Sequence, residues 1–124
     1  MQYMLLLHSD PSAFATMSKE DIDETFNAFM AYNAELAKAG VLRAGGQLQP
    51  SHTATTLRAK DGKVAMTDGP FAETKEQMGG YYIVEVDNLD DALTWAKRCP
   101  ILFGSGGVIE VRPVGTVPAE LQGE

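Results

Sequence analysis

The segment Tyr3-Met4-Leu5-Leu6-Leu7-His8 decides the fold, because it predicts a strand that is apolar on both faces. One side of this strand would carry Tyr3, Leu5 and Leu7, and the other would carry Met4, Leu6 and His8. A sheet built around it must therefore be covered on each face. The segment is too short to span a membrane and lacks the basic region and cleavage pattern of a signal peptide, so we expect a cytoplasmic protein.

The composition predicts one ordinary globular domain that covers residues 1–124. The chain has 124 residues, of which 44% are hydrophobic and 22% are charged, and its net charge is −7. An acidic surface repels phosphate groups, and no basic stretch is interleaved with aromatic residues. We therefore expect no nucleic-acid partner and no membrane partner.

Two helices are predicted from their end signals. Ser18 is a typical N-cap and Gly40 a typical C-terminal stop, so the first helix should run from Ser18 to Ala39. The second helix should begin after Asn88 and end before Pro100. The expected buried stripe of the first helix consists of Ile22, Phe26, Phe29, Met30, Leu36 and Ala37.

Further strands are expected at residues 41–47, 53–59, 64–67, 81–86 and 108–112. Asp61-Gly62 is a strong signal for a hairpin between the second and third of these. The order is thus β-α-β, a hairpin, and β-α-β again. It predicts an α+β fold of the ferredoxin-like, split β-α-β type, with an antiparallel sheet, two helices on one face and an inserted β-hairpin.

The uncovered face of this sheet predicts an assembly. Two helices on one face leave Met4 and Leu6 without cover on the other. We expect a homodimer in which two sheets pack face to face about a two-fold axis. The alternative is that the inserted hairpin folds back over this face of its own sheet.

The loop Asp68-Gly69-Pro70-Phe71-Ala72-Glu73-Thr74-Lys75-Glu76 places a stiff turn, an aromatic ring and four ionisable side chains within nine residues. Asp68 could act as a general base or orient a histidine, or it could cap the turn by accepting backbone N–H bonds. Phe71 could anchor the loop against the core or form a wall of a pocket. Lys75 could bind a substrate carboxylate, or it could pair with the neighbouring glutamates in a solvated turn.

Other candidate residues lie on the strands. His8 could titrate near neutral pH on the cleft face, or it could be a structural histidine. Arg58 on the hairpin or Arg112 on the last strand could neutralise an anionic ligand, or each could pair with a surface acid. Tyr81 and Tyr82 alternate across the sheet, so one should face the helices and the other the cleft.

The sequence predicts no metal and no cofactor. No spacing of Cys and His residues indicates a metal site, and no glycine-rich loop follows a strand in the pattern that binds phosphate. Cys99 is the single cysteine. It is expected to be a small buried residue near the end of the second helix.

Several stretches resemble the DGPF-domain branch of the YCII-related proteins. The matching stretches are Thr67–Glu76, Gly79–Val86, Ala54–Arg58, Asn88–Leu93 and Ile109–Val114, which together extend over nearly the whole chain. The resemblance implies a ferredoxin-like fold assembled as a dimeric α+β barrel. Relatives of this fold include isomerases and monooxygenases that act on small organic molecules. Members of this branch often accompany sigma factors of the extracytoplasmic-function type, which points to regulation or a stress response.

The resemblance also implies an acid-base pair, because a His and an Asp are associated with this role in the wider YCII family. Asp68 matches the Asp of the motif, and His8 ends the first strand, where relatives often carry Tyr or His.

Two functions remain open. The first is a dimer that binds a small organic molecule in its cleft. The second is a cofactor-independent lyase or isomerase-type enzyme in which His8 and Asp68 move a proton. The residues expected to contact the bound molecule are Arg58, Phe71, Lys75 and Tyr81.

Overall fold

The computed structural model describes residues 1–104, 106–118 and 121. The helices are α1 (Pro11–Ala15), α2 (Lys19–Lys38) and α3 (Leu89–Ala96), with short 3-10 helices η1 (Ser51–Thr53) and η2 (Pro100–Leu102). The strands are β1 (Gln2–Ser9), β2 (Leu42–Gln47), β3 (Thr55–Lys60), β4 (Lys63–Asp68), β5 (Gln77–Glu85) and β6 (Val108–Pro113).

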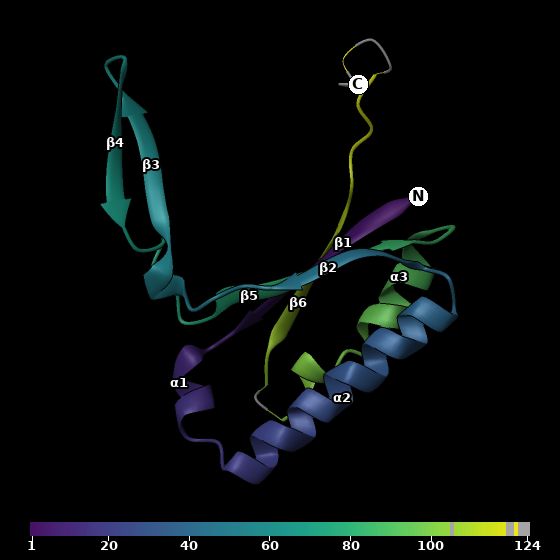
Figure 1. The fold of residues 1–124 in the computed structure, drawn as a ribbon. Helices are drawn as coiled ribbons and strands as arrows, with labels where there is room; N and C mark the ends of the chain where they lie inside the picture. Colours follow the sequence, from purple (N-terminus) through teal and green to yellow (C-terminus); the bar gives the residue numbers. More distant parts are fainter. Residues whose placement is uncertain (105, 119–120, 122–124) are drawn as a thin grey trace.

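The main sheet has the strand order β2-β5-β1-β6, and each neighbouring pair of strands is antiparallel. Helices α2 and α3 lie on the same face of this sheet (Figure 1). The predicted mixed α+β class with an antiparallel sheet is confirmed. Strand β1 is central, because it pairs with β5 on one side and with β6 on the other.

Strands β3 and β4 form a separate two-stranded sheet, which we call the arm (residues 55–68). The turn at its tip contains Asp61 and Gly62, both with positive φ angles, of 54° and 78°. These angles are typical of the tight turn that an Asp-Gly pair favours. The predicted hairpin is therefore confirmed. The arm projects from the body on the side of the main sheet opposite the helices (Figure 1), so the alternative in which it folds back over the sheet is wrong.

Helix α2 begins and ends where its capping residues predict. The Ser18 hydroxyl accepts a hydrogen bond from the Asp21 N–H at 3.1 Å, which satisfies one of the free donors of the first turn. Gly40 follows the helix with a φ of 74°, a left-handed conformation that glycine adopts without strain. The predicted boundaries are thus confirmed to within one residue at each end.

The buried stripe of α2 differs from the prediction. Tyr32 and Leu36 are its buried residues, and Phe29 packs against the core cluster that contains them. Phe26 and Met30, which the sequence pattern places in the stripe, are 64% and 55% exposed. The reason is geometric, because a helix presents only a narrow face to one side of a sheet, and these two positions lie beside that face.

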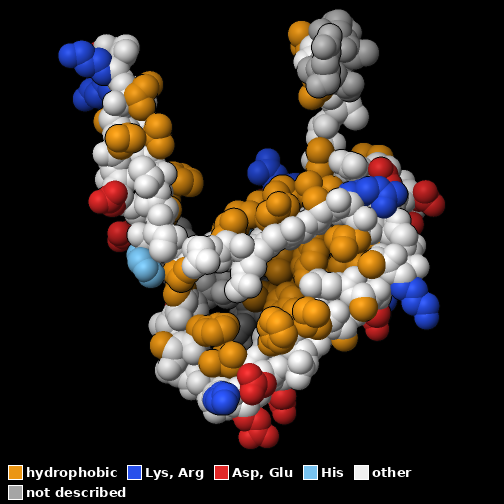
Figure 2. All heavy atoms as spheres, viewed as in Figure 1, with side chains coloured by type: hydrophobic (Ala, Val, Ile, Leu, Met, Phe, Trp, Pro, Cys, Tyr) orange, Lys and Arg blue, Asp and Glu red, His pale blue; other side chains and the backbone are white. Residues whose placement is uncertain are grey.

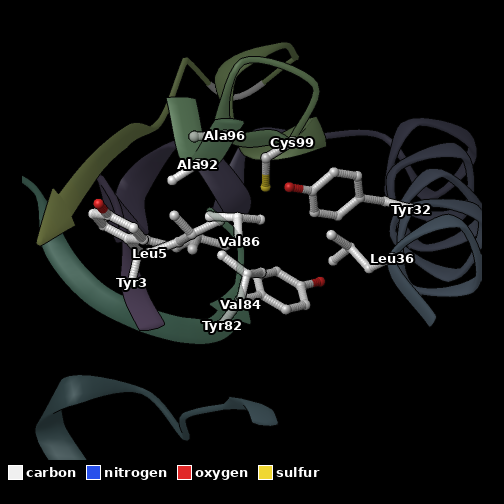
Figure 3. Close-up of a cluster of buried hydrophobic side chains, with 11 residues drawn as sticks. Tyr3, Leu5, Tyr32, Leu36, Tyr82, Val84, Val86, Ala92, Ala96 and Cys99 are labelled. Carbon is white, nitrogen blue, oxygen red and sulfur yellow. The ribbon is translucent and has the colours of Figure 1, made fainter. Parts of the chain in front are cut away.

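The core lies between the helices and the main sheet (Figure 3). Strand β1 contributes the buried residues Tyr3, Leu5 and Leu7, and β5 contributes Tyr82 and Val84. The buried residues from the helices and their connections are Tyr32, Leu36, Val86, Ala92, Ala96 and Cys99. The sheet therefore buries one complete row of β1 against the helices.

Two tyrosines and the single cysteine meet inside this core. The Tyr32 hydroxyl donates to the Trp95 carbonyl at 2.8 Å, and the Tyr82 hydroxyl donates to Asn33 Oδ1. The sulfur of Cys99 points toward the Tyr32 hydroxyl (Figure 3). Burial raises the pKa of Tyr82 to about 12 and the pKa of Cys99 to about 11. Cys99 is therefore a buried thiol, as predicted.

The opposite side of the main sheet, which we call the outer face, is not covered by any helix of the described residues. Its apolar residues are Met4 and Leu6 on β1 and Tyr81 and Ile83 on β5, each only partly buried. In Figure 2, hydrophobic side chains gather on the arm and along the sheet beside it. The second apolar row of β1 is therefore present, as predicted, and remains open in the single chain.

The raised pKa of Tyr82 predicts a loss of stability at alkaline pH. The unfolded chain releases this proton near pH 10, whereas the folded protein holds it until about pH 12. The unfolded state then binds fewer protons, so the free energy of unfolding falls as the pH rises from 10 to 12. Urea denaturation at pH 9 and pH 11.5 should show this fall. Tyr82→Phe should show a shallower fall, and equal falls in the two proteins would contradict the assignment.

Candidate functional site

The candidate site lies on the outer face where β1 ends. Leu7 pairs with Gly80 and His8 pairs with Met78, so Gly79 is an extra residue in β5 and forms a β-bulge. Bulges often occur beside functional sites, where they redirect a side chain. His8 follows the bulge on the outer face, and its side chain is 25% exposed.

The closest charged partner of His8 is on the neighbouring strand β6. His8 Nε2 lies 3.8 Å from Glu110 Oε1. Glu110 pairs with Leu6, so it is a diagonal neighbour of His8 on the same face. The separation is longer than a hydrogen bond, so the pair attracts through charge when the imidazole is protonated. A histidine with a carboxylate within reach is an arrangement that general acid-base catalysis uses.

Sequence reasoning did not find Glu110 as a partner of His8. The alternation of side chains along the last strand could have placed Glu110 on the outer face. Because Ile109 and Val111 pack against the core, the residue between them must face outward. Arg112 pairs with Met4 and lies on the outer face as well. The pairing with His8 itself depends on the register between β1 and β6, which composition does not reveal.

Tyr81 is the tyrosine of the outer face, and Tyr82 faces the helices. The position of a Cβ atom at Gly46 would lie 3.2 Å from the Tyr81 ring, and one at Gly45 would lie 3.1 Å from the Tyr82 ring. The two glycines of β2 therefore leave room for two successive tyrosine rings on opposite faces. The predicted alternation is confirmed, and the reason for Gly45-Gly46 becomes clear.

Asp68 ends β4 at the base of the arm and is exposed. It pairs with Thr55, and the next pair on the same face of the arm is Leu57 with Met66. The Gly69 N–H donates to the Ala54 carbonyl at 2.7 Å, so one of the donors that the capping interpretation named for the Asp68 carboxylate has another acceptor. The single chain gives Glu110, not Asp68, as the ionic partner of His8.

The other predicted contact residues are not gathered at one place. Arg58 lies on the face of the arm opposite Asp68, because it pairs with Ala65. Phe71 is 80% exposed, so its interpretation as an anchor in the core of its own chain is wrong. Lys75 lies near Asp10, whose pKa is lowered mainly by hydrogen bonds from Ser12 and slightly by the Lys75 charge.

Two hollows lined by described residues lie elsewhere. The first, of about 480 Å³, lies between α2 and η2 and is lined in part by Tyr32, Glu35 and Arg98. The second, of about 300 Å³, lies beside Trp95 and the carboxylates of Glu85 and Asp91. Neither is lined by a predicted site residue. An open sheet face becomes a cavity only when something covers it.

Residues 1–104, 106–118 and 121 contain neither a group of metal ligands nor a membrane-spanning helix. Among these residues, no three His, Cys, Asp or Glu side chains lie together in a way that could hold a metal ion. In the same part of the chain, no helix has both the length and the apolar character needed to cross a bilayer.

Gly107 fixes the backbone around His8. Its N–H donates to the Ile101 carbonyl at 2.8 Å. A Cβ atom at this position would lie 2.4 Å from Ile101 Cγ1 and 2.9 Å from the His8 carbonyl oxygen. The segment before β6 can therefore pack on the end of β1 only because residue 107 has no side chain.

We expect Gly107→Ala to destabilise the protein by about 1–3 kcal/mol, because the added methyl group forces backbone shifts in a packed region. Gly115→Ala is the matched control, since no atom of the described residues other than Gly115 and its two chain neighbours lies within 4 Å of the place that its methyl group would occupy. It should change the free energy of unfolding by less than about 0.5 kcal/mol. Urea denaturation measures both, and equal stability of the two variants would refute the packing argument.

Comparisons with known proteins agree with this architecture. A family model of the YCII-related domain matches residues 1–117. The uncharacterized protein R00369 of Rhizobium meliloti (strain 1021) is 37% identical over 122 residues, which is 98% of each chain. The fold is similar to that of a solved structure, 5-chloro-2-hydroxyhydroquinone dehydrochlorinase (TftG) from Burkholderia phenoliruptrix AC1100 in complex with 2,5-dihydroxybenzoquinone. The two structures align with a TM-score of 0.53 and a sequence identity of 19%, and the alignment covers 93% of this chain and 94% of that chain. At this identity the likeness concerns the fold. The chain belongs to the YCII-related domain family.

Proposed function

We propose that this protein is a homodimer that binds a small organic molecule in a cleft between two facing sheets. The observation that supports it most is the outer face, which is apolar, open in the single chain, and carries His8, Glu110 and Tyr81 near one end. Ligand sites usually combine mostly apolar walls with a few fixed polar groups. The outer face of this sheet has that composition.

A second copy is the cover that this face fits best. Two identical sheets related by a two-fold axis would each bury the apolar row of the other, and full burial of such a side chain contributes about 1.5–3 kcal/mol. This arrangement is the dimeric α+β barrel of ferredoxin-like subunits. The loop motif Asp68–Glu76 supports placing the chain in the DGPF branch of the family. A regulatory or stress-linked role for the bound form is part of this proposal.

The second candidate is a cofactor-independent lyase or isomerase-type enzyme. His8 beside Glu110 favours it, because a histidine with a nearby carboxylate can remove a proton from a phenol or an activated carbon atom. In the dimer, Asp68 at the base of the partner's arm would be the other half of the acid-base pair. The dehydrochlorinase with a similar fold acts on a chlorinated hydroxyhydroquinone and was solved with a dihydroxybenzoquinone. We extend this substrate class, small hydroxylated rings, to the present chain.

The test is a thermal-shift screen with 2,5-dihydroxybenzoquinone, simple phenols and small organic acids. A ligand at about 100 times its Kd should raise the Tm of the wild type by several degrees. His8→Gln and Asp68→Asn should lose this shift, because each removes a group that holds the ligand. Asp61→Asn, the same substitution at the tip of the arm, should retain it.

Two results would count against the proposal. One is a wild type that no compound stabilises. The other is a shift of equal size in the wild type, His8→Gln and Asp68→Asn. A slow change in the absorbance of a bound ring, seen in the wild type and absent in His8→Gln, would favour the enzyme over the binding module.

A further inference from the structure

The arm has one apolar face and one polar face. Cross-strand pairing places Leu57 opposite Met66 and Ala59 opposite Val64 on one face. The other face carries Thr56 with Thr67, Arg58 with Ala65, and Lys60 with Lys63. This strict alternation is typical of a hairpin that packs one face against another surface.

No part of the described chain covers the apolar face. Leu57 is 60% exposed, Val64 is 65% exposed and Met66 is 73% exposed. An isolated two-stranded hairpin is at best marginally stable in water, and it needs a further layer to hold its shape. The regular pairing from Thr55 to Lys60 and from Lys63 to Asp68 therefore indicates that the arm has a packing partner outside this chain.

The position of the arm indicates which partner it meets. It rises from the body on the side of the main sheet that carries the outer face, opposite α2 and α3 (Figure 1). A copy of the chain that covers the outer face is thus placed beside the arm. Strands of six residues reach about 20 Å, whereas facing sheets lie about 10 Å apart. The arm is therefore long enough to extend past the partner's sheet toward its helices.

The charge of the arm fits a second copy. It carries the basic residues Arg58, Lys60 and Lys63 and the acidic residues Asp61 and Asp68, so three positive charges less two negative ones leave a net charge of +1. The whole chain has a net charge of −7, so the arm is a basic segment of an acidic protein. Such a segment is attracted to the surface of another copy, whereas the acidic body is repelled by an anionic membrane.

We propose that the arm packs its apolar face, formed by Leu57, Ala59, Val64 and Met66, against a second copy of this chain. The arrangement is reciprocal, so each subunit holds the other. This inference rests on the dimer of the proposed function, and it adds the arm as a second contact between the subunits. Asp68 shares the apolar face and then lies at the boundary between the subunits. Phe71, which follows at the base of the arm, then has a partner in the assembly.

The first experiment measures the dimer Kd by sedimentation velocity. In one variant, Leu57→Ser and Met66→Ser are combined, which removes the central pair of the apolar face. The control combines Ala65→Ser and Thr67→Ser on the polar face. Because each change acts in both arms, we expect the Kd of the first variant to rise at least about 100-fold and that of the control to stay within about threefold. An unchanged Kd in the first variant would overturn the proposal.

The second experiment measures hydrogen exchange of the arm amides. In the wild-type dimer we expect protection of β3 and β4 that is lost in Leu6→Glu, which places a charge on the outer face and separates the subunits. Dilution of the wild type below its Kd gives the same comparison without a substitution. Arm amides that exchange equally fast in dimer and monomer would refute the proposal and leave a dimer held by the sheets alone.

A wild type that stays monomeric at all concentrations would overturn both this proposal and the proposed dimer. If this monomer also sediments together with anionic vesicles, the binding partner of the apolar face is a lipid surface. Binding of the arm to a protein of different sequence, with no self-association, would assign it to that protein. In either case the second copy is excluded as the partner.

Discussion

Strand β1 lies at the centre of the main sheet, and its side chains are apolar on both faces. Tyr3, Leu5 and Leu7 form one row, which is buried on the helix side of the sheet. Met4 and Leu6 form the other row, which none of the described helices covers. A central strand of this kind needs two layers, and the described part of the single chain supplies one. The position of the candidate site, the proposed dimer and the role of the arm all depend on this requirement.

The same constraint explains why the site sits where it does. His8 is the last outward residue of the apolar row, so it marks the point at which an apolar surface becomes polar. The bulge at Gly79 and the bare backbone of Gly107 fix the end of β1 from both sides. Glu110 then approaches His8 from β6, and the Tyr81 ring lies over Gly46 from β5. A ligand between two such faces would meet apolar walls in the middle and titratable groups near one end.

Local chemistry determined how much could be predicted from the sequence. The Ser18 cap, the Gly40 stop and the Asp61-Gly62 turn each act within a few residues, so the elements they delimit were predicted correctly. The order of the elements then led to the α+β class. Long-range geometry was harder. The proximity of His8 and Glu110 requires the register of β1 and β6, and the exposure of Phe26 and Met30 requires the exact rotation of α2. The exposure of Phe71 could not be predicted for the same reason, because its surroundings depend on the position of the arm and its loop relative to the body.

The measurement that tests the central claim most directly is hydroxyl-radical footprinting of the wild type over a series of protein concentrations. Met4 reports on the outer face, and Met30, which is 55% exposed on α2, reports on ordinary surface. If a second copy covers the outer face, the oxidation rate of Met4 falls as the concentration enters the micromolar range, while that of Met30 stays constant. A Met4 rate that does not depend on protein concentration would contradict this account, because the outer face would then be either open to water or covered by its own chain.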